Sequence, residues 1–454
     1  MPPDPNDHGL LSAAETSLLT DLYELNMAAG YHRAGIDETA IFELFVRRLP
    51  PRRDWLLCAG LGPTLRLITE MRFGPRELEY LESRGFDSSF LDRLSVFRFR
   101  GDFDAMPEGT LAFANEPLLR VTAPRIEAQL LETLLLNQVN FQTMAATKAA
   151  RVVLAAGGGE PGHGDRVVDF SPRRDHGVDA AMKVARSAAV AGCAGTSNVA
   201  AAMRYGLAPV GTMAHSFVLS FPSEREAFEA YLEAFPENTT LLVDTFDVEE
   251  GVRNAITASQ ATGVPLGGVR IDSGDLVALA RQSRRQLDEA GMRDSEITVS
   301  GDLEEVRIAE LVGSGAPIDR FGVGTDLGTS RDSPTVNGVY KLVADLGAAG
   351  WRGVRKLSAQ KETLPGPKQV WRRRQGGLMA GDLVAPDGES HDGEPLLAPF
   401  MRGGEICREE SLEQIAERAQ RELAALPEEL RQAQPGPAAA PYPVAFAESL
   451  RLID

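Results

Sequence analysis

The sequence is poor in cysteine and lacks the long apolar stretch that a membrane-spanning helix needs. Its 454 residues include three cysteines, Cys58, Cys193 and Cys407, which have no zinc-ligand spacing and are too few to cross-link so long a chain. No run of about 18 apolar residues occurs, and the N-terminal residues lack the basic and apolar parts of a signal peptide. We therefore expect a soluble, cytoplasmic protein with free thiols that does not bind membranes.

Positive charge is also scarce. The 47 Lys and Arg residues face 65 Asp and Glu residues, which leaves a net charge of −18. Because general binding to nucleic acids needs a basic face, this balance excludes that class of function. The composition is that of an ordinary globular protein, with 43% hydrophobic and 25% charged residues. The sequence GxxxxGK[ST] is absent, so any use of ATP is not of the Walker type.

The pattern of the first third of the chain predicts an N-terminal α+β domain. Residues 1–16 are polar and contain prolines, which predicts a disordered leader. Helical spacing from Leu18 and the strand-like FELFV that follows predict an α+β domain over residues 17–122. Residues 125–155 have apolar side chains at helical spacing and contain no Gly or Pro, which predicts a long, largely buried helix.

Seven short apolar runs then recur, each ending in Gly or a polar residue and followed by a helical segment. They are DRVVDF, AAVAGCAG, LAPVGT, TLLVD, LGGVRI, EITVS and DRFGVG. Successive βα units of this kind build a parallel sheet or barrel, whose reactive groups lie at the carboxyl ends of the strands. We therefore expect an α/β-barrel domain over residues 123–335. The alternation stops in residues 336–454, which we expect to pack on the other two parts and to bury Trp351, Trp371 and Phe400.

Two of these strand ends are rich in glycine. Ser300, Gly301 and Asp302 in SGDLEE, and Gly322, Gly324 and Thr325 in FGVGTDLG, let backbone N–H groups approach an anion. Each motif alone is equally consistent with glycines that only allow tight turns. Two on consecutive units favour a phosphate site.

Carboxylates follow two further strands. Asp272 and Asp275 surround Ser273 and Gly274 in IDSGDL, and Asp244 and Asp247 lie in TLLVDTFD. Beside a phosphate loop, carboxylates need Mg²⁺ or ribose hydroxyls between themselves and the ligand, which suits a sugar diphosphate. The alternative is that Asp272 and Asp275 are helix N-caps. TLLVDTFDVEEG lacks the paired acids and the Thr-Gly of type I phosphoribosyltransferases.

A histidine and several arginines complete the candidate site. His215 follows a strand in VGTMAHSFV and suits a phosphate acceptor or general base, although a buried core histidine is an equal alternative. His176 is the second choice. Arg173 and Arg270, with Phe170 alongside, suit a planar carboxylate ring through pairing and stacking. Arg174 is the one for which a surface position is the simpler interpretation.

Nine motifs in this order resemble nicotinate phosphoribosyltransferases. They are TDLYELNMAAGY, FELFVRRLP, VDFSPRRDHG, GTSNVAAAMRYG, GTMAHSFV, VRIDSGDL, SGDLEE, FGVGTDLG with NGVYKL, and KLSAQKETLPGPKQVWR, from about residue 18 to 375. The resemblance implies an N-terminal α+β domain and an incomplete, seven-stranded α/β barrel of the type II phosphoribosyltransferases, in homodimers with shared active sites. It also implies formation of nicotinate mononucleotide and diphosphate from nicotinate and phosphoribosyl diphosphate, with Mg²⁺ as cofactor. ATP is an implied co-substrate, hydrolysed through a phosphohistidine, and the reaction begins NAD synthesis from nicotinate.

The resemblance also assigns roles to single residues. His215 matches the phosphorylated histidine, and Asp272 is the second catalytic residue. The residues expected to contact nicotinate are Tyr23, donated across the dimer, and Phe170, Arg173, Ser197, Thr212 and Arg270. The residues expected to contact phosphoribosyl diphosphate are Asp244, Ser273, Gly274, Ser300, Gly301, Asp302, Gly322, Gly324 and Thr325. Mg²⁺ is expected to be held mainly through the substrate, with Asp272 or Asp244 nearby.

Ser197 in GTSNV discriminates between related substrates. Nicotinamide-using relatives resemble this chain but carry an aspartate there, which accepts from an amide and repels a carboxylate, whereas serine donates to a carboxylate. Nicotinate is therefore the expected substrate.

Ser171 and Pro172 depart from the Gly that often follows the Phe of VDF in the family. The alternatives are a nicotinamide or quinolinate phosphoribosyltransferase, or an inactive paralogue, against which His215, Asp272 and the glycine loops argue. Since the chain is acidic overall, the positive field at the site must come from local groups. We expect it from Arg173, Arg270, Mg²⁺, the loop N–H groups and the basic residues 354–374.

Overall fold

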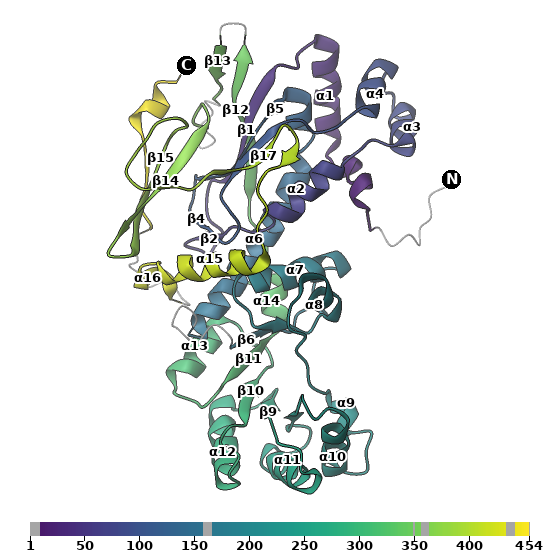
Figure 1. Ribbon diagram of the computed structural model, residues 1–454, viewed down its shortest axis with the longest axis vertical. Coiled ribbons are helices and arrows are strands. Elements are labelled where there is room, and N and C mark those ends of the chain that lie inside the picture. Colours follow the sequence, from purple (N-terminus) through teal and green to yellow (C-terminus); the bar gives the residue numbers. More distant parts are fainter. Residues whose placement is uncertain (1–9, 158–165, 348–349, 356–362, 433–440, 454) are drawn as a thin grey trace. The chain divides into compact units, whose positions relative to one another are not determined.

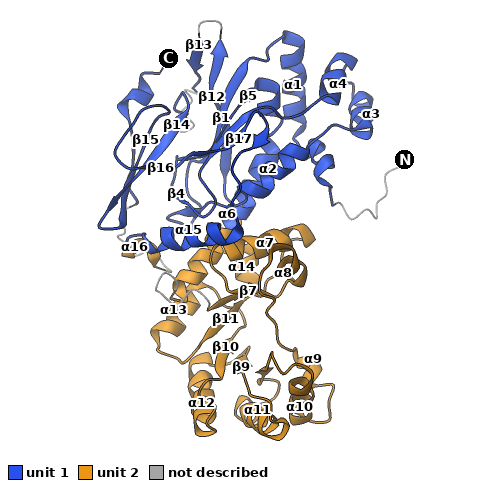
Figure 2. Cartoon of the chain, viewed as in Figure 1, with its two compact units in different colours: residues 1–144, 335–427, 440–454 blue, residues 145–334, 428–439 orange. Residues whose placement is uncertain are grey.

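A computed structural model of the chain describes residues 10–157, 166–347, 350–355, 363–432 and 441–453. Two compact units result, coloured separately in Figure 2. The first comprises residues 1–144, 335–427 and 440–454, and the second comprises residues 145–334 and 428–439. Within the described ranges, every helix is too short or not apolar enough to span a bilayer.

A seven-stranded sheet forms the centre of the first unit, with the order β13-β12-β1-β5-β3-β17-β18 (Figure 1). Its strands are β1 (Thr39–Val46), β3 (Asp102–Ala105), β5 (Pro117–Pro124), β12 (Gly338–Gly347), β13 (Gly350–Gly353), β17 (Ala398–Arg402) and β18 (Glu405–Ile406). The central strand β1 is antiparallel to both β5 and β12. Four strands after residue 336, namely β12, β13, β17 and β18, therefore share one sheet with the N-terminal strands. This differs from the expected separate C-terminal segment, because pairing between strands almost 300 residues apart leaves no local pattern.

Smaller elements complete the first unit. The remaining strands are β2 (Leu56–Leu57), β4 (Leu111–Ala112), β14 (Lys368–Gln375), β15 (Leu378–Pro386), β16 (Glu394–Pro395) and β19 (Val444–Phe446). The helices are η1 (Ala13–Leu18), α1 (Leu22–Ala34), α2 (Leu61–Glu70), α3 (Pro75–Ser83), α4 (Ser88–Ser95), α5 (Arg125–Gln129), α15 (Leu412–Ala424) and η2 (Glu448–Arg451).

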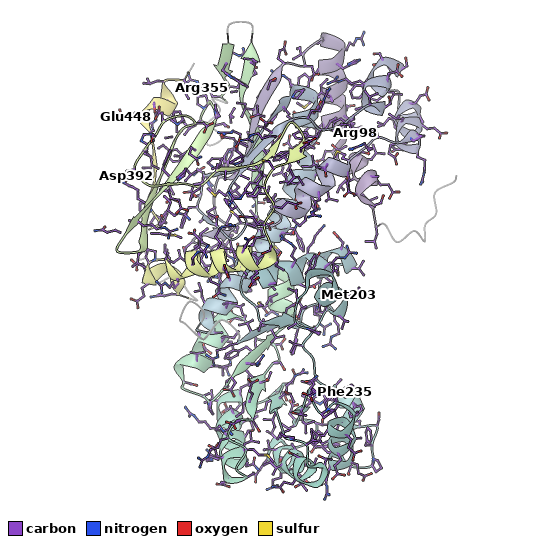
Figure 3. All side chains as sticks on the ribbon, in the orientation of Figure 1. Arg98, Met203, Phe235, Arg355, Asp392 and Glu448 are labelled. Atoms are coloured by element: carbon purple, nitrogen blue, oxygen red, sulfur yellow. The ribbon has the colours of Figure 1, made fainter. Side chains whose placement is uncertain are left out.

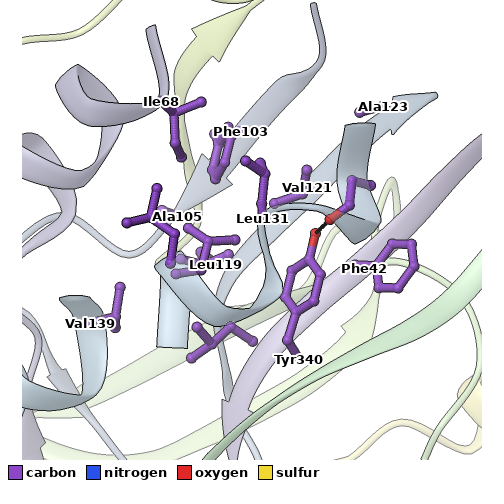
Figure 4. Close-up of a cluster of buried hydrophobic side chains, with 14 of the residues drawn as sticks. Phe42, Ile68, Phe103, Ala105, Leu119, Val121, Ala123, Leu131, Val139 and Tyr340 are labelled. Atoms are coloured by element: carbon purple, nitrogen blue, oxygen red, sulfur yellow. Dashed lines mark hydrogen bonds between the residues drawn. The ribbon is translucent and has the colours of Figure 1, made fainter. Parts of the chain in front are cut away.

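Apolar side chains from β1, β3, β5, α5 and β12 form the core of this unit (Figure 4). The rings of Phe42 and Tyr340 stack with centroids 4.9 Å apart. The Tyr340 hydroxyl, although buried, donates a hydrogen bond of 3.0 Å to the Ala128 carbonyl oxygen, drawn dashed in Figure 4. This bond satisfies the polar end of an otherwise apolar side chain, as a buried tyrosine requires.

Two expectations about helices need correction. Residues 1–9 of the expected leader lie outside the described residues, but Ala13–Leu18 forms a 3₁₀ helix, whose start is capped by a 2.9 Å bond from the Ser12 amide to the Glu15 carboxylate. The helix expected over residues 125–155 is broken into α5 and α6 (Glu132–Ala155). At the break, the Leu131 amide bonds to Ala128, three residues back, and this tighter turn interrupts the α-helical ladder.

The expectations for the C-terminal aromatic and basic residues are also met only in part. Phe400 is buried and Trp371 is partly buried. Trp351, in contrast, is 51% exposed, contrary to expectation, because it lies on the edge strand β13, which pairs with β12 on one side. Of the basic stretch 354–374, residues 356–362 lie outside the described residues. Lys368 pairs with Glu43 at 2.8 Å, and buried Arg372 pairs with Asp382 at 2.6 Å. These two charges are neutralised inside the first unit and supply no free positive field.

The second unit is built around a six-stranded parallel half-barrel, ordered β7-β6-β11-β10-β9-β8. Its strands are β6 (Val167–Asp169), β7 (Gly195–Thr196), β8 (Thr240–Leu242), β9 (Gly268–Ile271), β10 (Glu296–Val299) and β11 (Arg320–Val323). Its helices are α7 (Val178–Val190), α8 (Val199–Tyr205), α9 (His215–Val218), α10 (Glu224–Ala234), α11 (Val248–Thr262), α12 (Leu276–Glu289), α13 (Glu305–Gly313), α14 (Thr325–Thr329) and α16 (Glu428–Arg431). The strand that begins the series, β6, pairs with the strand that ends it, β11, so the sheet curls back on itself.

Six strands form where seven were expected. LAPVGT contributes only an isolated parallel bridge between Thr196 and Pro209, because proline has no N–H with which to continue a ladder. The half-barrel is therefore open between this segment and β8. AAVAGCAG is also shorter as a strand than expected. Its first three residues end α7, as their alanine content favours, and only Gly195–Thr196 is extended.

Candidate active site

The strand register brings the candidate residues of the second unit to one edge of the half-barrel. Arg270 of β9 is level with Leu242 of β8 and Thr298 of β10, and Asp169 of β6 is level with Val323 of β11 and Thr196 of β7. The residues that follow these positions therefore emerge together at the carboxyl ends of the strands, where sites in such folds lie. Asp244, Asp272, Ser300, Gly324, Phe170 and Ser197 are the residues in question.

The guanidinium of Arg270 contacts several of the side chains at this edge. It donates hydrogen bonds to the Ser300 hydroxyl (2.9 Å), the Thr212 hydroxyl (3.2 Å) and the Asp272 carboxylate (3.1 Å). Its central carbon also lies 5.3 Å from the ring centroid of Phe170. The side chain is 16% exposed, so one surface remains open to a ligand. A planar cation beside an aromatic ring can pair with a carboxylate while a flat ligand stacks on the ring.

Asp244 and Asp272 form a connected acidic pair. Asp244 Oδ2 accepts hydrogen bonds from the Asp272 amide (2.8 Å) and the Ser273 hydroxyl (3.1 Å). Burial acts to raise the pKa of Asp272, but hydrogen bonds from Ser300 and Arg270 outweigh it and hold this pKa below its ordinary value. Asp272 is therefore a carboxylate at neutral pH. Asp247 and Asp275, in contrast, accept from the amides of Glu250 and Ala278 as helix N-caps, so the N-cap interpretation is right for Asp275 and wrong for Asp272.

His215 lies beside the acidic pair at the start of α9, not at a strand end as expected, because LAPVGT forms no strand. Its Nδ1 is 3.1 Å from the Thr245 hydroxyl, and its Nε2 is 3.9 Å from Asp244 Oδ1. The imidazole is 43% exposed, which rules out a buried core histidine. One ring nitrogen is thus oriented by neighbouring side chains while the ring stays accessible.

The end of β6 holds a buried carboxylate that the sequence analysis did not single out. Asp169 accepts hydrogen bonds from the Thr196 hydroxyl (2.7 Å) and the Ser171 amide (2.9 Å), while its backbone carbonyl accepts from the Ser197 amide (2.8 Å). Burial raises the pKa of Asp169. These bonds fix the backbone on either side of Phe170 and at Ser197. Its position as the last residue of a strand is the feature of the sequence by which Asp169 could have been found.

Glycine next to Phe170 is required for space. A Cβ added at Gly322 would lie 2.4 Å from the Phe170 ring. At Gly301 the backbone has φ +90°, and a Cβ would lie 2.0 Å from the Asp272 carbonyl oxygen. The following Asp302 also has positive φ, at 46°. The glycines of both loops thus allow the strand ends to pack closely, which agrees with the alternative that they serve tight turns. They also leave backbone groups of both loops at the same edge.

The remaining candidates lie on other elements. Arg173, Arg174 and His176 have exposed side chains on the loop after β6. Thr325 begins α14 and is partly exposed. Tyr23 lies on α1 in the first unit and is 48% exposed. Burial, followed by the charge of Glu132, raises the pKa of the Tyr23 hydroxyl.

Oxygen donors suited to Mg²⁺ are present, although few. Asp244 Oδ1 is buried and accepts no hydrogen bond from a described residue, and it lies in a side chain that is 1% exposed. In the part of the chain that the structure describes, no three His, Cys, Asp or Glu side chains are arranged to bind a metal together. Mg²⁺ is typically bound by one or two carboxylates, and substrate phosphates and water complete its coordination.

Comparisons with known proteins agree with this architecture. The family model described as the nicotinate phosphoribosyltransferase N-terminal domain matches residues 18–140, and that of the nicotinate phosphoribosyltransferase family matches residues 166–345. A nicotinate phosphoribosyltransferase of Mycobacterium tuberculosis is 44% identical over 96% of this chain and 92% of its own length. One from Bacillus subtilis is 42% identical over 85% and 79%.

The fold also matches that of a solved relative. The crystal structure of human nicotinic acid phosphoribosyltransferase superposes with a TM-score of 0.83, at 29% identity, over 96% of this chain and 99% of that one. A nicotinate-nucleotide pyrophosphorylase of Pyrococcus furiosus gives a TM-score of 0.73 at 25% identity, over 91% and 97%. The sequence matches span both units and most of the chain, and the chain therefore belongs to the nicotinate phosphoribosyltransferase family.

Proposed function

We propose that the protein is a nicotinate phosphoribosyltransferase, which joins nicotinate to phosphoribosyl diphosphate. The observation that carries this proposal is the Arg270 guanidinium, which lies over Phe170 and is bonded to Thr212, Asp272 and Ser300 at the carboxyl ends of the strands. A cation next to an aromatic ring suits a flat carboxylate ligand. The relatives from Mycobacterium tuberculosis and Bacillus subtilis are named as nicotinate phosphoribosyltransferases, which supports the same activity here.

The reaction places simple demands on these residues. The pyridine nitrogen attacks C1 of the ribose, the bond from C1 to the diphosphate oxygen breaks, and the electron pair leaves with diphosphate. No proton needs to be transferred, so the residues mainly position the reactants and offset charge. Arg270, Phe170, Thr212 and Ser197 would orient nicotinate, with Arg173 nearby. Asp244, Ser273, Gly274, Ser300, Gly301, Asp302, Gly322, Gly324 and Thr325 would surround the ribose and phosphates.

Mg²⁺ belongs to this proposal. Asp244, through the Oδ1 that accepts no hydrogen bond from a described residue, and Asp272 would hold the ion next to the substrate phosphates. When bound, Mg²⁺ supplies positive charge that stabilises the leaving diphosphate. The repulsion between two carboxylates and an anionic substrate is a further reason to expect a cation there.

We further propose that ATP is a co-substrate and that its phosphate is transferred to His215. The exposed imidazole, with Nδ1 beside Thr245 and Nε2 beside Asp244, supports this role. A phosphate on the ring would add negative charge and reorder nearby polar groups, so it would act on substrate affinity rather than on bond making.

The shared-site homodimer and the cytoplasmic location are retained as proposals. Apolar side chains on two helices support a second copy as partner: Leu22 and Met27 of α1 are 61% and 38% exposed, and Val199 and Met203 of α8 are 71% and 84% exposed (Figure 3 labels Met203). Tyr23 lies on the same α1 helix, as donation across a dimer requires. The three free cysteines support a reducing compartment.

Nicotinate-dependent release of diphosphate, measured with and without ATP, tests the activity. Faster turnover of nicotinamide would refute the choice of nicotinate, which rests on Ser197. Turnover of neither pyridine would favour an inactive paralogue.

A substitution tests the role of His215. We expect His215→Ala to fold normally and to lose stimulation by ATP, because the ring nitrogen that would accept phosphate is removed. Transfer of radiolabelled phosphate from ATP should disappear in this variant and persist in His176→Ala, in which another exposed histidine is removed. An unchanged ATP dependence of His215→Ala would exclude His215 from this role.

A further inference from the structure

A fully buried lysine lies behind both glycine loops of the second unit. Lys148 comes from the part of α6 that belongs to this unit, and its side chain is 0% exposed. Its ammonium lies 2.5 Å from Glu305, 3.0 Å from Asp332 and 3.8 Å from Asp326. A lysine without exposure is rare unless it is paired, and this one is surrounded by carboxylates.

Two of the three carboxylates lie within the SGDLEE and FGVGTDLG motifs, and the third follows shortly after the second motif. Glu305 is the first residue of α13 and the last residue of the SGDLEE motif, which also contains Ser300–Asp302. Asp326 is the second residue of α14 and the neighbour of Thr325 in the other loop. Asp332 follows a turn at Ser330, a buried residue with φ +44°, which folds the chain back so that Asp326 and Asp332 both face Lys148. One ammonium therefore joins both loops to the long helix α6.

Two arginines also contact the carboxylates around Lys148. Arg151 lies 3.2 Å from Glu305, and Arg331 lies 2.8 Å from Asp326. Three cations thus face three carboxylates. Burial acts to raise the pKa of Glu305, but Lys148 and Arg151 hold it below the ordinary value, so the carboxylate is charged. Removing one buried cation would leave Glu305 without its closest partner, and both loops would lose their common anchor.

We propose that Lys148 is a positioning residue for the phosphoribosyl diphosphate site, where it fixes the SGDLEE and FGVGTDLG loops relative to each other. This inference rests on the proposed function, since it assumes that these loops bind the diphosphate. Lys148 touches no substrate. It acts through Glu305, Asp326 and Asp332, and a shift of these loops by a fraction of an ångström would misplace the groups that contact the phosphates.

Two kinds of measurement test this role: titration of wild-type and variant proteins with magnesium diphosphate, and steady-state kinetics with each substrate varied. We expect Lys148→Met to weaken diphosphate binding about tenfold and to raise KM for phosphoribosyl diphosphate similarly, while KM for nicotinate changes little. Lys148→Arg should recover part of this loss. Lys183→Met is the matched control, since Lys183 pairs with Asp179 on the surface of α7 and should bind diphosphate normally.

A double variant separates positioning from stability. Lys148→Met with Glu305→Gln removes both members of the buried pair, and it should recover much of the thermal stability without recovering diphosphate affinity. Recovery of both together, or an equal rise of KM for the two substrates, would overturn the proposal, as would wild-type affinity in Lys148→Met. If wild-type protein binds diphosphate but does not turn over nicotinate, the proposed function fails and the positioning role remains testable by titration. A wild type that does not bind diphosphate would overturn the positioning role itself.

Discussion

The contacts of Arg270 allow the effect of a conservative substitution to be worked out in advance. Arg270→Lys keeps the positive charge but replaces the planar fork by a single ammonium group. The fork reaches Ser300, Thr212 and Asp272 at 2.9, 3.2 and 3.1 Å, and a lysine at this position can reach one of them. Two hydrogen bonds are therefore lost, one to a hydroxyl and one to either the second hydroxyl or the carboxylate.

The size of the effect follows from the type of bond. A net hydrogen bond contributes about 1 kcal/mol between neutral groups and about 1.5–3 kcal/mol when a charged group takes part. Because the guanidinium is charged, both lost bonds are of the second kind, and the summed loss is about 3–6 kcal/mol. This corresponds to a roughly 150-fold to 25,000-fold lower kcat/KM for nicotinate if the contacts serve the transition state. If the lysine bonds to a hydroxyl instead of Asp272, the carboxylate loses a hydrogen bond that lowers its pKa, and this pKa should rise. The acid limb of the pH profile would then move to higher pH.

Steady-state diphosphate release between pH 5 and 9 is the assay for both effects. The control is Arg253→Lys, in which a surface arginine paired with Glu249 on α11 is changed in the same way and kcat/KM should stay close to wild type. A folded Arg270→Lys variant with wild-type kcat/KM and an unmoved acid limb would refute the reasoning, because the fork would then be dispensable.

Two further predictions concern the same unit. Burial, followed by the charge of Asp169, raises the pKa of Asp175 to about 6, so Asp175 stabilises the fold at acid pH and this contribution is lost as the pH rises from about 4 through 6. Asp175→Asn should reduce that loss in thermal denaturation curves recorded across this range, and an identical pH slope in both proteins would contradict it. Gly322→Ala puts a Cβ 2.4 Å from the Phe170 ring and should cost about 1–3 kcal/mol of stability and raise KM for nicotinate. Gly313→Ala, where nothing lies within 4 Å, is the control, and equal melting temperatures for the two variants would contradict the expected clash.

Aspartates that lie close together in one motif have different structural roles, and the direction of each side chain determines which role it has. Asp272 and Asp275 lie in one tetrapeptide of the sequence, yet Asp272 bonds to Arg270 and Ser300 while Asp275 caps α12. The same division separates Asp244 from Asp247. A sequence shows the type and order of such residues, but the first turn of the following helix decides which of them faces the site.

The sequence by itself determined the family, the series of βα units and the strand ends at which the polar residues gather. These features are local, since apolar runs, glycines and helical spacing are encoded over a few neighbouring residues. Tertiary structure alone decided that Pro209 forms a bridge instead of a strand, and that β12 pairs with β1. It also decided that Lys148 meets Glu305, 157 residues further along the chain. These features depend on which distant segments meet, and the free energy of such pairing is set by packing and burial in the folded chain rather than by any local pattern.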